Sequence, residues 1–434
     1  MYPIEPPAVY IHESVMADER YRRRAEGVVR ALQKPIEPVV YRDADLPALI
    51  AEAGLLKGRV PMGTLAEVQD PILLFNTFRF DGRRDERAEA LRSVGCDPTW
   101  HGHALLGYGA FNWANYNLDG DPARHDKVCR PCWRIHLQNG CVHHCIYCGF
   151  GGLLVAMANV EDYCHHLGHI IERHPWQQTY LLDDDGDPPC LEPEHGTLGP
   201  LIEFFGTVPD RYLVIHTKTW NTAWMADLAH NGHTIIVWSL SGPSQSRIIE
   251  PKTGTTEQRI EAARIAQQAG YPIRYKLKPI IPVKTWREDA AATVKLLFER
   301  TDPDMISLCC FMWMDIDDML RRVPEDLLDP AFVKAARDGR EETEPTRAKP
   351  FPLAARAEIY DLYLSEIRRW NPDVPVSLST ENFTMWKLFG PKLGFTATNY
   401  VCGCGPQSVP GARKLGCHPF QVAVRNDEGI PGTF

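Results

Sequence analysis

The sequence predicts an α/β protein built around a partial (βα) barrel of six or seven units. From about residue 133, short apolar runs alternate with helical patterns, which indicates right-handed βαβ units and a parallel sheet. The expected helices include Val160–Arg173, Thr256–Gln268 and Arg287–Arg300. A barrel of this kind carries its active site at the carboxyl ends of its strands. The expected strands are Arg134–Gln138, Thr179–Leu182, Tyr212–His216, Thr234–Ser239, Ile273–Ile280, Met305–Phe311 and Val374–Leu378.

Three regions are expected along the chain. Residues 1–128 are interpreted as a small N-terminal α/β region, 129–393 as the barrel, and 394–434 as a cysteine-containing extension. An acidic, proline-containing stretch at 312–351 interrupts the rhythm of the barrel, and we interpret it as an insertion or flap at its mouth. The first region is predicted from a helical pattern and three strand-like runs, namely Met16–Leu32, Ala8–Ile11, Val39–Tyr41 and Ile72–Phe75.

Composition narrows the functional classes. The chain has 434 residues, of which 44% are hydrophobic, enough for a packed core. Its net charge of −9 argues against a general affinity for nucleic acid, which needs many lysines and arginines. No secretory signal or membrane-length apolar run is apparent, so we expect a cytoplasmic protein with no membrane partner. Thirteen cysteines in such a chain indicate metal binding rather than disulfides.

The central motif is Cys141-Val-His-His-Cys145-Ile-Tyr-Cys148, directly after the first predicted barrel strand. Three thiolates on a tight loop can hold three irons of a [4Fe–4S] cluster, which leaves the fourth iron open to a small molecule. The alternative is a zinc site with His143 or His144 as a ligand. Zinc sites use four protein ligands and usually a CxxC knuckle, so we favour the cluster.

This spacing, with an aromatic residue before the last cysteine, resembles the signature of radical S-adenosylmethionine (radical SAM) enzymes. The resemblance implies a partial (βα)6-type radical SAM barrel whose open iron binds the amino and carboxylate groups of S-adenosylmethionine. Reductive cleavage then gives methionine and a 5′-deoxyadenosyl radical, with electrons from a donor such as flavodoxin or ferredoxin. The cofactor carries the difficult chemistry, and the protein orients it and excludes water.

Within that superfamily, residues 5–310 resemble the spore photoproduct lyase family. The likeness rests on short stretches whose order and spacing agree, including Val9-Tyr10-Ile11, Ile202–Gly206, Thr217-Lys218, His230-Asn231-Gly232, Trp238-Ser239, Arg259–Ala263 and Ala269–Pro272.

The resemblance implies a cofactor site. Lys218 and Ser239 match the lysine and serine that bind the cofactor carboxylate, and a lysine that ends an apolar strand needs an anionic partner. Ser239 has the alternative of being an ordinary buried strand serine. Asp183 and Asp185 lie where the amino group is held, although three adjacent aspartates are also typical of a solvated loop. Tyr147 is expected near the adenine or the cluster.

Other positions depart from the family. Gly149 stands where the lyase has the second of two relay tyrosines, and Cys190 lies about four residues beyond the expected hydrogen-donor cysteine. Cys309 and Cys310 end a predicted strand, so one faces the interior; we take Cys310 as the inward one and a candidate donor. The alternative is that both are small core residues.

Five further cysteines suggest a second metal site. Glycine-flanked cysteines in loops are typical of metal knuckles, and the C-terminal extension could fold back against the barrel. A second iron–sulfur cluster or a zinc ion is the functional interpretation, and ordinary free thiols are the alternative. The five residues are Cys129, Cys132, Cys402, Cys404 and Cys417.

We therefore predict a radical SAM enzyme that abstracts hydrogen from a small-molecule or peptide substrate. A pocket lined by Cys310, Met312 and Trp313 would suit a compact, partly apolar ligand, so DNA is not an expected partner. The alternative function is repair of a thymine photoproduct in DNA, as in the lyase family. A third hypothesis, a non-catalytic zinc scaffold, predicts zinc and no iron in the purified protein.

Overall fold

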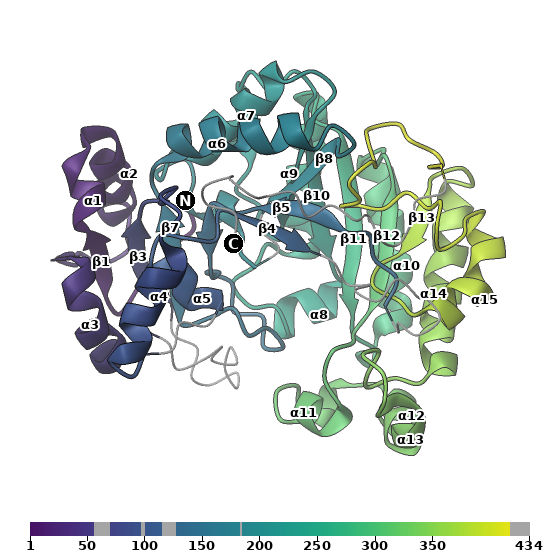
Figure 1. Ribbon diagram of the computed structural model, residues 1–434. Helices are drawn as coiled ribbons and strands as arrows, with labels where there is room; N and C mark the ends of the chain where they lie inside the picture. Colours follow the sequence, from purple (N-terminus) through teal and green to yellow (C-terminus); the bar gives the residue numbers. More distant parts are fainter. Residues whose placement is uncertain (56–69, 97–99, 115–126, 183–184, 417–434) are drawn as a thin grey trace.

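An eight-stranded sheet forms the centre of the computed structural model, which describes residues 1–55, 70–96, 100–114, 127–182 and 185–416. Its strand order is β13-β12-β11-β10-β9-β8-β5-β4 (Figure 1). All seven predicted barrel strands are present and pair in parallel, whereas β4 adds an antiparallel edge. The strands are β4 (Phe111–Ala114), β5 (Cys132–Ile135), β8 (Thr179–Leu182), β9 (Tyr212–Thr217), β10 (Thr234–Leu240), β11 (Ile273–Ile280), β12 (Ile306–Cys310) and β13 (Val376–Leu378).

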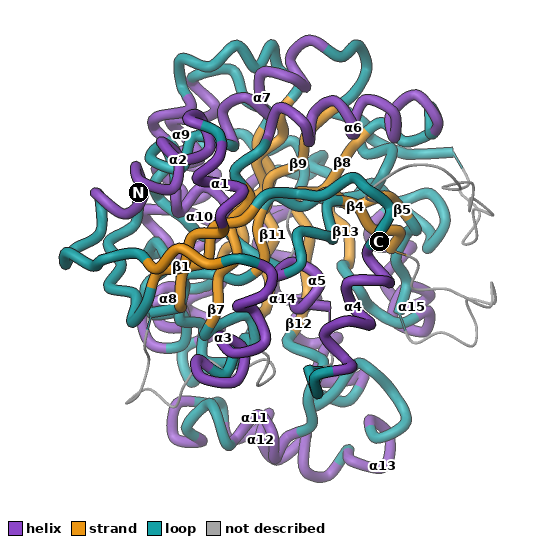
Figure 2. The backbone as a smooth tube through the Cα atoms, turned by 60° about the vertical axis from the view of Figure 1, so that its left-hand side comes forward, coloured by secondary structure: helices purple, strands orange, loops and turns teal. Residues whose placement is uncertain are grey.

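Helices cover the outer face of this sheet and give the partial barrel its second layer (Figure 2). Apolar side chains on one stripe of each helix pack against the strands, and α9 starts at a capping box in which Thr255 and Gln258 bond reciprocally. The helices are α6 (Val160–Arg173), α7 (Leu198–Thr207), α8 (Pro243–Ile248), α9 (Thr256–Gln268), α10 (Trp286–Arg300), α14 (Leu353–Trp370) and α15 (Phe383–Leu393).

A second sheet, of order β2-β1-β3-β7-β6, forms the N-terminal part of the molecule. The predicted helix Met16–Leu32 is two helices, because Asp18 ends the first and caps the second through the amide of Arg20. This sheet comprises β1 (Val9–His12), β2 (Val39–Tyr41), β3 (Ile72–Asn76), β6 (Gln138–Asn139) and β7 (Leu153–Met157). Its helices are α1 (Glu13–Ala17), α2 (Glu19–Arg30), α3 (Leu46–Ala53), α4 (Arg84–Ser93) and α5 (Trp100–Leu105).

Each of the two sheets contains strands from both sides of the expected domain boundary at residue 128. β4 comes from the N-terminal region but pairs with β5 of the barrel, while β7 comes from the barrel region but pairs with β3. The chain passes from the barrel to the N-terminal sheet between β5 and β6 and returns to the barrel after β7. The cysteine motif lies in the loop between β6 and β7, which are neighbouring strands of the N-terminal sheet.

Two further segments lie at opposite ends of the barrel (Figure 1). Residues 312–351 leave the carboxyl end of β12 and form α11 (Ile316–Leu320), α12 (Pro330–Asp338) and α13 (Arg340–Thr343). The tail, described to residue 416, lies at the amino ends of the strands. There the carbonyl of Pro406 accepts hydrogen bonds from Gln178 and Thr179, and Gly411 donates to Asp304.

No helix in the described ranges has the length and apolarity needed to cross a bilayer.

Candidate active site

One cavity inside the barrel contains most of the residues singled out from the sequence. The cysteines Cys141, Cys145 and Cys148 all line it. Its wall also includes side chains of barrel strands that point into the barrel. Alternate side chains of a strand point to the same face, so every second residue can line the cavity. Those side chains are Arg134, Leu181, His216, Ser239, Lys276 and Lys278, and Lys218 follows the end of β9.

The cysteine loop starts at a glycine that no other residue could replace without strain. Gly140 has a φ of +103°, and a Cβ there would lie 2.0 Å from the carbonyl oxygen of Leu153. Farther along, the amide of His144 donates to Pro251, and the amide of Ile146 donates to Ile249. These backbone bonds fix the loop against the segment that follows α8.

The sulfur atoms fit an iron–sulfur cluster. The amide of His143 lies 3.5 Å from Cys141 Sγ, and that of Phe150 lies 3.4 Å from Cys148 Sγ, as donors to thiolate sulfur would. Burial raises the pKa of Cys145 to about 12, so this thiol holds its proton until a metal displaces it.

The histidines within the motif have partners that leave them poorly placed to complete a zinc site. His143 contacts Asp187 through Nε2 at 2.8 Å and the carbonyl of Lys252 through Nδ1 at 2.7 Å. His144 Nε2 pairs with Asp70 at 2.8 Å. A zinc ion on this loop would therefore lack a fourth protein ligand, and the cluster interpretation is favoured.

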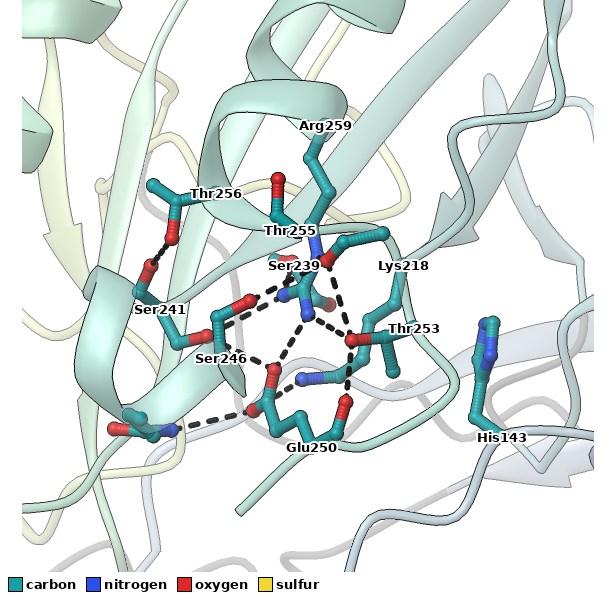
Figure 3. Close-up of polar contacts among 12 residues, drawn as sticks. His143, Lys218, Ser239, Ser241, Ser246, Glu250, Thr253, Thr255, Thr256 and Arg259 are labelled. Atoms are coloured by element: carbon teal, nitrogen blue, oxygen red, sulfur yellow. Dashed lines mark hydrogen bonds and ion pairs between the residues drawn. The ribbon is translucent and has the colours of Figure 1, made fainter. Parts of the chain in front are cut away.

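Lys218 has an anionic partner that sequence reasoning missed. Its Nζ lies 2.7 Å from Glu250, whose carboxylate is wholly buried and also pairs with Arg259 at 2.8 Å (Figure 3). Although burial opposes ionisation, these two cations hold the pKa of Glu250 well below its usual range. Lys218 is thus fixed in place at the cavity wall.

The hydroxyl of Tyr147 completes this network. It donates to Glu250 at 2.8 Å, and the tyrosine ring lies 5.7 Å from Lys218 Nζ. Tyr147 lines the cavity beside the cysteines, as expected from its position in the motif.

The aspartates are only partly described. Asp183 lies outside the described residues, whereas Asp185 lines the cavity. Asp187, which the sequence analysis did not single out, lines it as well and accepts from Thr217 at 2.7 Å and from the Lys218 amide at 2.7 Å. Ser239 lines the cavity and is not a buried core serine.

The two candidate hydrogen donors lie elsewhere. Cys190 is not among the cavity-lining residues; its Sγ is 3.4 Å from His143 Nε2, behind the cysteine loop. The assignment of Cys310 as the inward cysteine is wrong. Its backbone amide donates to the hydroxyl of Tyr360 on α14, and its thiol interacts with Arg356 of the same helix, whereas Cys309 Sγ contacts Thr380 of the cavity lining. Ser307 and Cys309 share the inward phase of β12, so Cys310 faces the helices.

The cavity is more cationic than predicted. Cys310 and Met312 do not line it, and of the expected apolar trio Trp313 alone does. Two carboxylates, Asp185 and Asp187, face five basic side chains. The basic residues are Lys127, Arg134, Lys218, Lys276 and Lys278.

Two of the five additional cysteines, Cys129 and Cys404, also line the cavity. Cys402 lies beside Cys404, and Cys132 lies on β5, buried. Cys417 lies outside the described residues.

Residues 129–313 match the family model of spore photoproduct lyase. Over this part, the chain resembles the spore photoproduct lyase family of radical SAM proteins. It is 28% identical over 177 residues to the lyase of Bacillus subtilis, and 25% identical over 178 residues to that of Clostridium acetobutylicum. Each match covers 39% of this chain and 51% or 53% of the relative, so the chain spans about half the length of these curated relatives.

Solved structures share the fold of the lyase-like chain. A spore photoproduct lyase complexed with dinucleoside spore photoproduct has a TM-score of 0.59 at 17% identity, covering 87% of this chain and 98% of that one. A lyase variant with bound AdoMet and the same dinucleoside has a TM-score of 0.58 at the same identity and coverage. The family resemblance and the fold class are confirmed. The expectation that nucleic acid is no partner conflicts with the ligand in these relatives.

Proposed function

We propose that this chain is a radical SAM enzyme whose [4Fe–4S] cluster is held by Cys141, Cys145 and Cys148. One observation carries the proposal: the three cysteines share a single cavity with Lys218, Ser239 and Asp185. A reduced cluster with bound S-adenosylmethionine supplies a 5′-deoxyadenosyl radical that abstracts hydrogen from a substrate.

The protein's own part is binding and orientation. Lys218 and Ser239 are suited to the cofactor carboxylate, and Asp185 to its amino group. Because Glu250 already holds the ammonium of Lys218 at 2.7 Å, that cation is positioned before the cofactor arrives. Its charge is shared with Glu250, so hydrogen-bond geometry rather than an uncompensated charge would select the carboxylate.

The cavity lining supports an anionic substrate. Lys276 and Lys278 lie on β11 with Arg134 opposite on β5, all facing inward. A small anionic molecule or an acidic peptide could form ion pairs with these basic side chains. The second candidate is reversal of a thymine photoproduct, which the family match and the dinucleoside bound by structural relatives favour. Trp313, 44% exposed at the cavity, offers a stacking surface for a base.

The cofactor assignment is tested by anaerobic reconstitution. We expect iron, sulfide, and slow formation of 5′-deoxyadenosine from S-adenosylmethionine with dithionite or reduced flavodoxin. Replacing Cys141, Cys145 and Cys148 together by Ala should abolish that activity, whereas Cys164→Ala on α6 should not. Zinc without iron in the wild-type protein, or full activity in the triple variant, would reject the proposal.

The substrate candidates are separated by supplying the dinucleotide photoproduct to the reconstituted enzyme. Turnover to thymines would establish the lyase activity. Cofactor cleavage without thymine release would reject repair and leave a different anionic substrate.

A further inference from the structure

Two cysteines lie next to each other where the C-terminal tail meets the active-site cavity. Cys402 and Cys404 are separated by a single glycine, and Cys404 lines the cavity. The thiol of Cys402 donates a hydrogen bond to the sulfur of Cys404. We propose that these two cysteines form a redox-active dithiol, which closes reversibly into a disulfide.

The backbone of the tail brings the two sulfurs within reach of each other. Gly403 and Cys404 lie in a tight turn. A turn holds the Cα atoms at its two ends within about 7 Å, and a disulfide joins Cα atoms about 4.4–6.8 Å apart. The amide of Cys402 donates to Ser408 Oγ at 3.1 Å, which fixes the turn. A Cβ on Gly405 would lie 2.7 Å from Cys402 Sγ, so glycine leaves the space that this sulfur occupies.

Cys404 has the surroundings of a nucleophilic thiolate. Lys276 Nζ lies 3.9 Å from its sulfur, and this lysine is 6% exposed. A buried ammonium group is costly without an anionic neighbour. Although burial opposes ionisation, the hydrogen bond from Cys402 and the charge of Lys276 hold the pKa of Cys404 well below its ordinary value. Cys404 is therefore the attacking sulfur, and Cys402 is the thiol that completes the disulfide.

The sequence analysis also suggested a metal site for these thiols. Within the described ranges, His143, Asp187 and Cys190 form the one group of three potential ligands whose donor atoms all lie within 4.8 Å of one another. Cys402 and Cys404 belong to no such group among the described residues. Direct contact between two thiols at the end of a cavity is instead what disulfide formation requires.

The oxidation is a two-electron exchange with a small disulfide. The Cys404 thiolate attacks one sulfur of this reagent, which gives a mixed disulfide and releases one thiolate. Cys402 then gives its proton to that thiolate and attacks the sulfur of Cys404, which releases the second thiolate. The protein loses two electrons, and the reagent gains them as its S–S bond breaks. Closure also removes the anionic sulfur beside Lys276, so oxidation makes the cavity more cationic.

The test measures the redox state of one tryptic peptide. Cleavage after Lys392 and Arg413 gives a fragment whose only cysteines are Cys402 and Cys404. The anaerobically reconstituted protein is incubated with hydroxyethyl disulfide, quenched in acid, denatured, labelled with N-ethylmaleimide and digested. We expect a fragment that is lighter by two hydrogen atoms and carries no label, and we expect dithiothreitol to restore both labels. Cys164 is the internal control and should stay fully labelled, because burial raises its pKa to about 12.

Two variants identify the attacking sulfur. Cys402→Ser should trap the hydroxyethyl mixed disulfide on Cys404, whereas Cys404→Ser should leave Cys402 labelled by N-ethylmaleimide. The proposal is overturned if the wild-type fragment still takes two labels after oxidation, if either cysteine pairs with a third one, or if Cys402→Ser traps no adduct. The wild-type measurement needs no substitution, so it holds even where a variant fails to fold. It reads peptide mass and not S-adenosylmethionine cleavage, so its failure is distinguishable from failure of the proposed activity.

Discussion

The hydroxyl of Tyr147 donates a 2.8 Å hydrogen bond to the carboxylate of Glu250. This contact joins the cysteine loop to a buried acid that also receives Lys218 and Arg259. Glu250 therefore connects the loop expected to carry the cluster with the lysine expected to bind the cofactor. Its replacement should affect stability and cofactor binding together.

Glu250→Gln should destabilise the fold strongly. The substitution keeps the shape but leaves two cations without their buried counter-charge, which typically costs about 3–5 kcal/mol. Urea unfolding of the metal-free triple alanine variant, with and without Glu250→Gln, gives the difference in free energy of unfolding. Glu257→Gln in the exposed first turn of α9 is the matched control and should cost less than about 1 kcal/mol.

The same acid should make stability depend on pH. Because the pKa of Glu250 is lowered in the folded protein, its contribution is present above the unfolded value of about 4.3 and is lost as pH falls below it. The urea midpoint should therefore drop more steeply between about pH 5 and 3 with Glu250 than with Gln at this position. Parallel midpoints would show that the carboxylate is not ionised in the fold.

Lys218→Met should weaken binding of S-adenosylmethionine. Loss of one charge-assisted hydrogen bond corresponds to about 1.5–3 kcal/mol, or roughly a 10- to 150-fold higher Kd. Equilibrium dialysis on reconstituted protein measures it, with Lys334→Met on the exposed α12 as the control. Unchanged affinity would place the cofactor carboxylate elsewhere, without bearing on the cluster.

Gly140→Ala should prevent formation of the cysteine loop. A methyl group there meets the Leu153 carbonyl at 2.0 Å and the backbone has a φ of +103°, so the loop must move. We expect little iron incorporation and a lower melting temperature. Gly168→Ala on α6, where a Cβ has nothing within 4 Å, should be neutral or stabilising by up to about 1 kcal/mol. Normal iron content in Gly140→Ala would refute this account of the loop.

The barrel strands could be predicted from the sequence because each is an apolar run bounded by turns. Thr179–Leu182 and Ile273–Ile280 match β8 and β11 residue for residue. The short β6 and β7 were missed, since β7 leaves the barrel to join a sheet built mostly from earlier chain. Tertiary packing decides which sheet β7 joins, and the local sequence contains no pattern that predicts it.

At the site, sequence spacing identified the cysteine loop but not its neighbours. Glu250 follows a short helix and has no pattern of its own; its role arises because Lys218, Tyr147 and Arg259 converge on it. Cys309 and Cys310 were assigned the wrong way round because a strand's phase depends on which face meets the helices. Ser307, which faces inward to bond Gly403 of the tail, fixes that phase.

The tail at the amino ends of the strands also has a consequence for biosynthesis. Pro406 is bonded to Gln178 and Thr179 at the start of β8, and Gly411 to Asp304 just before β12. The ribosome releases β8 and β12 before it releases the tail residues that bond to them. In the growing chain, the amino end of the barrel sheet is therefore still uncovered. The tail covers this end of the barrel only after the last part of the chain emerges. A nascent chain that stops before residue 400 would therefore expose the apolar side chains of Leu181, Val214 and Val237 to the cell's chaperones.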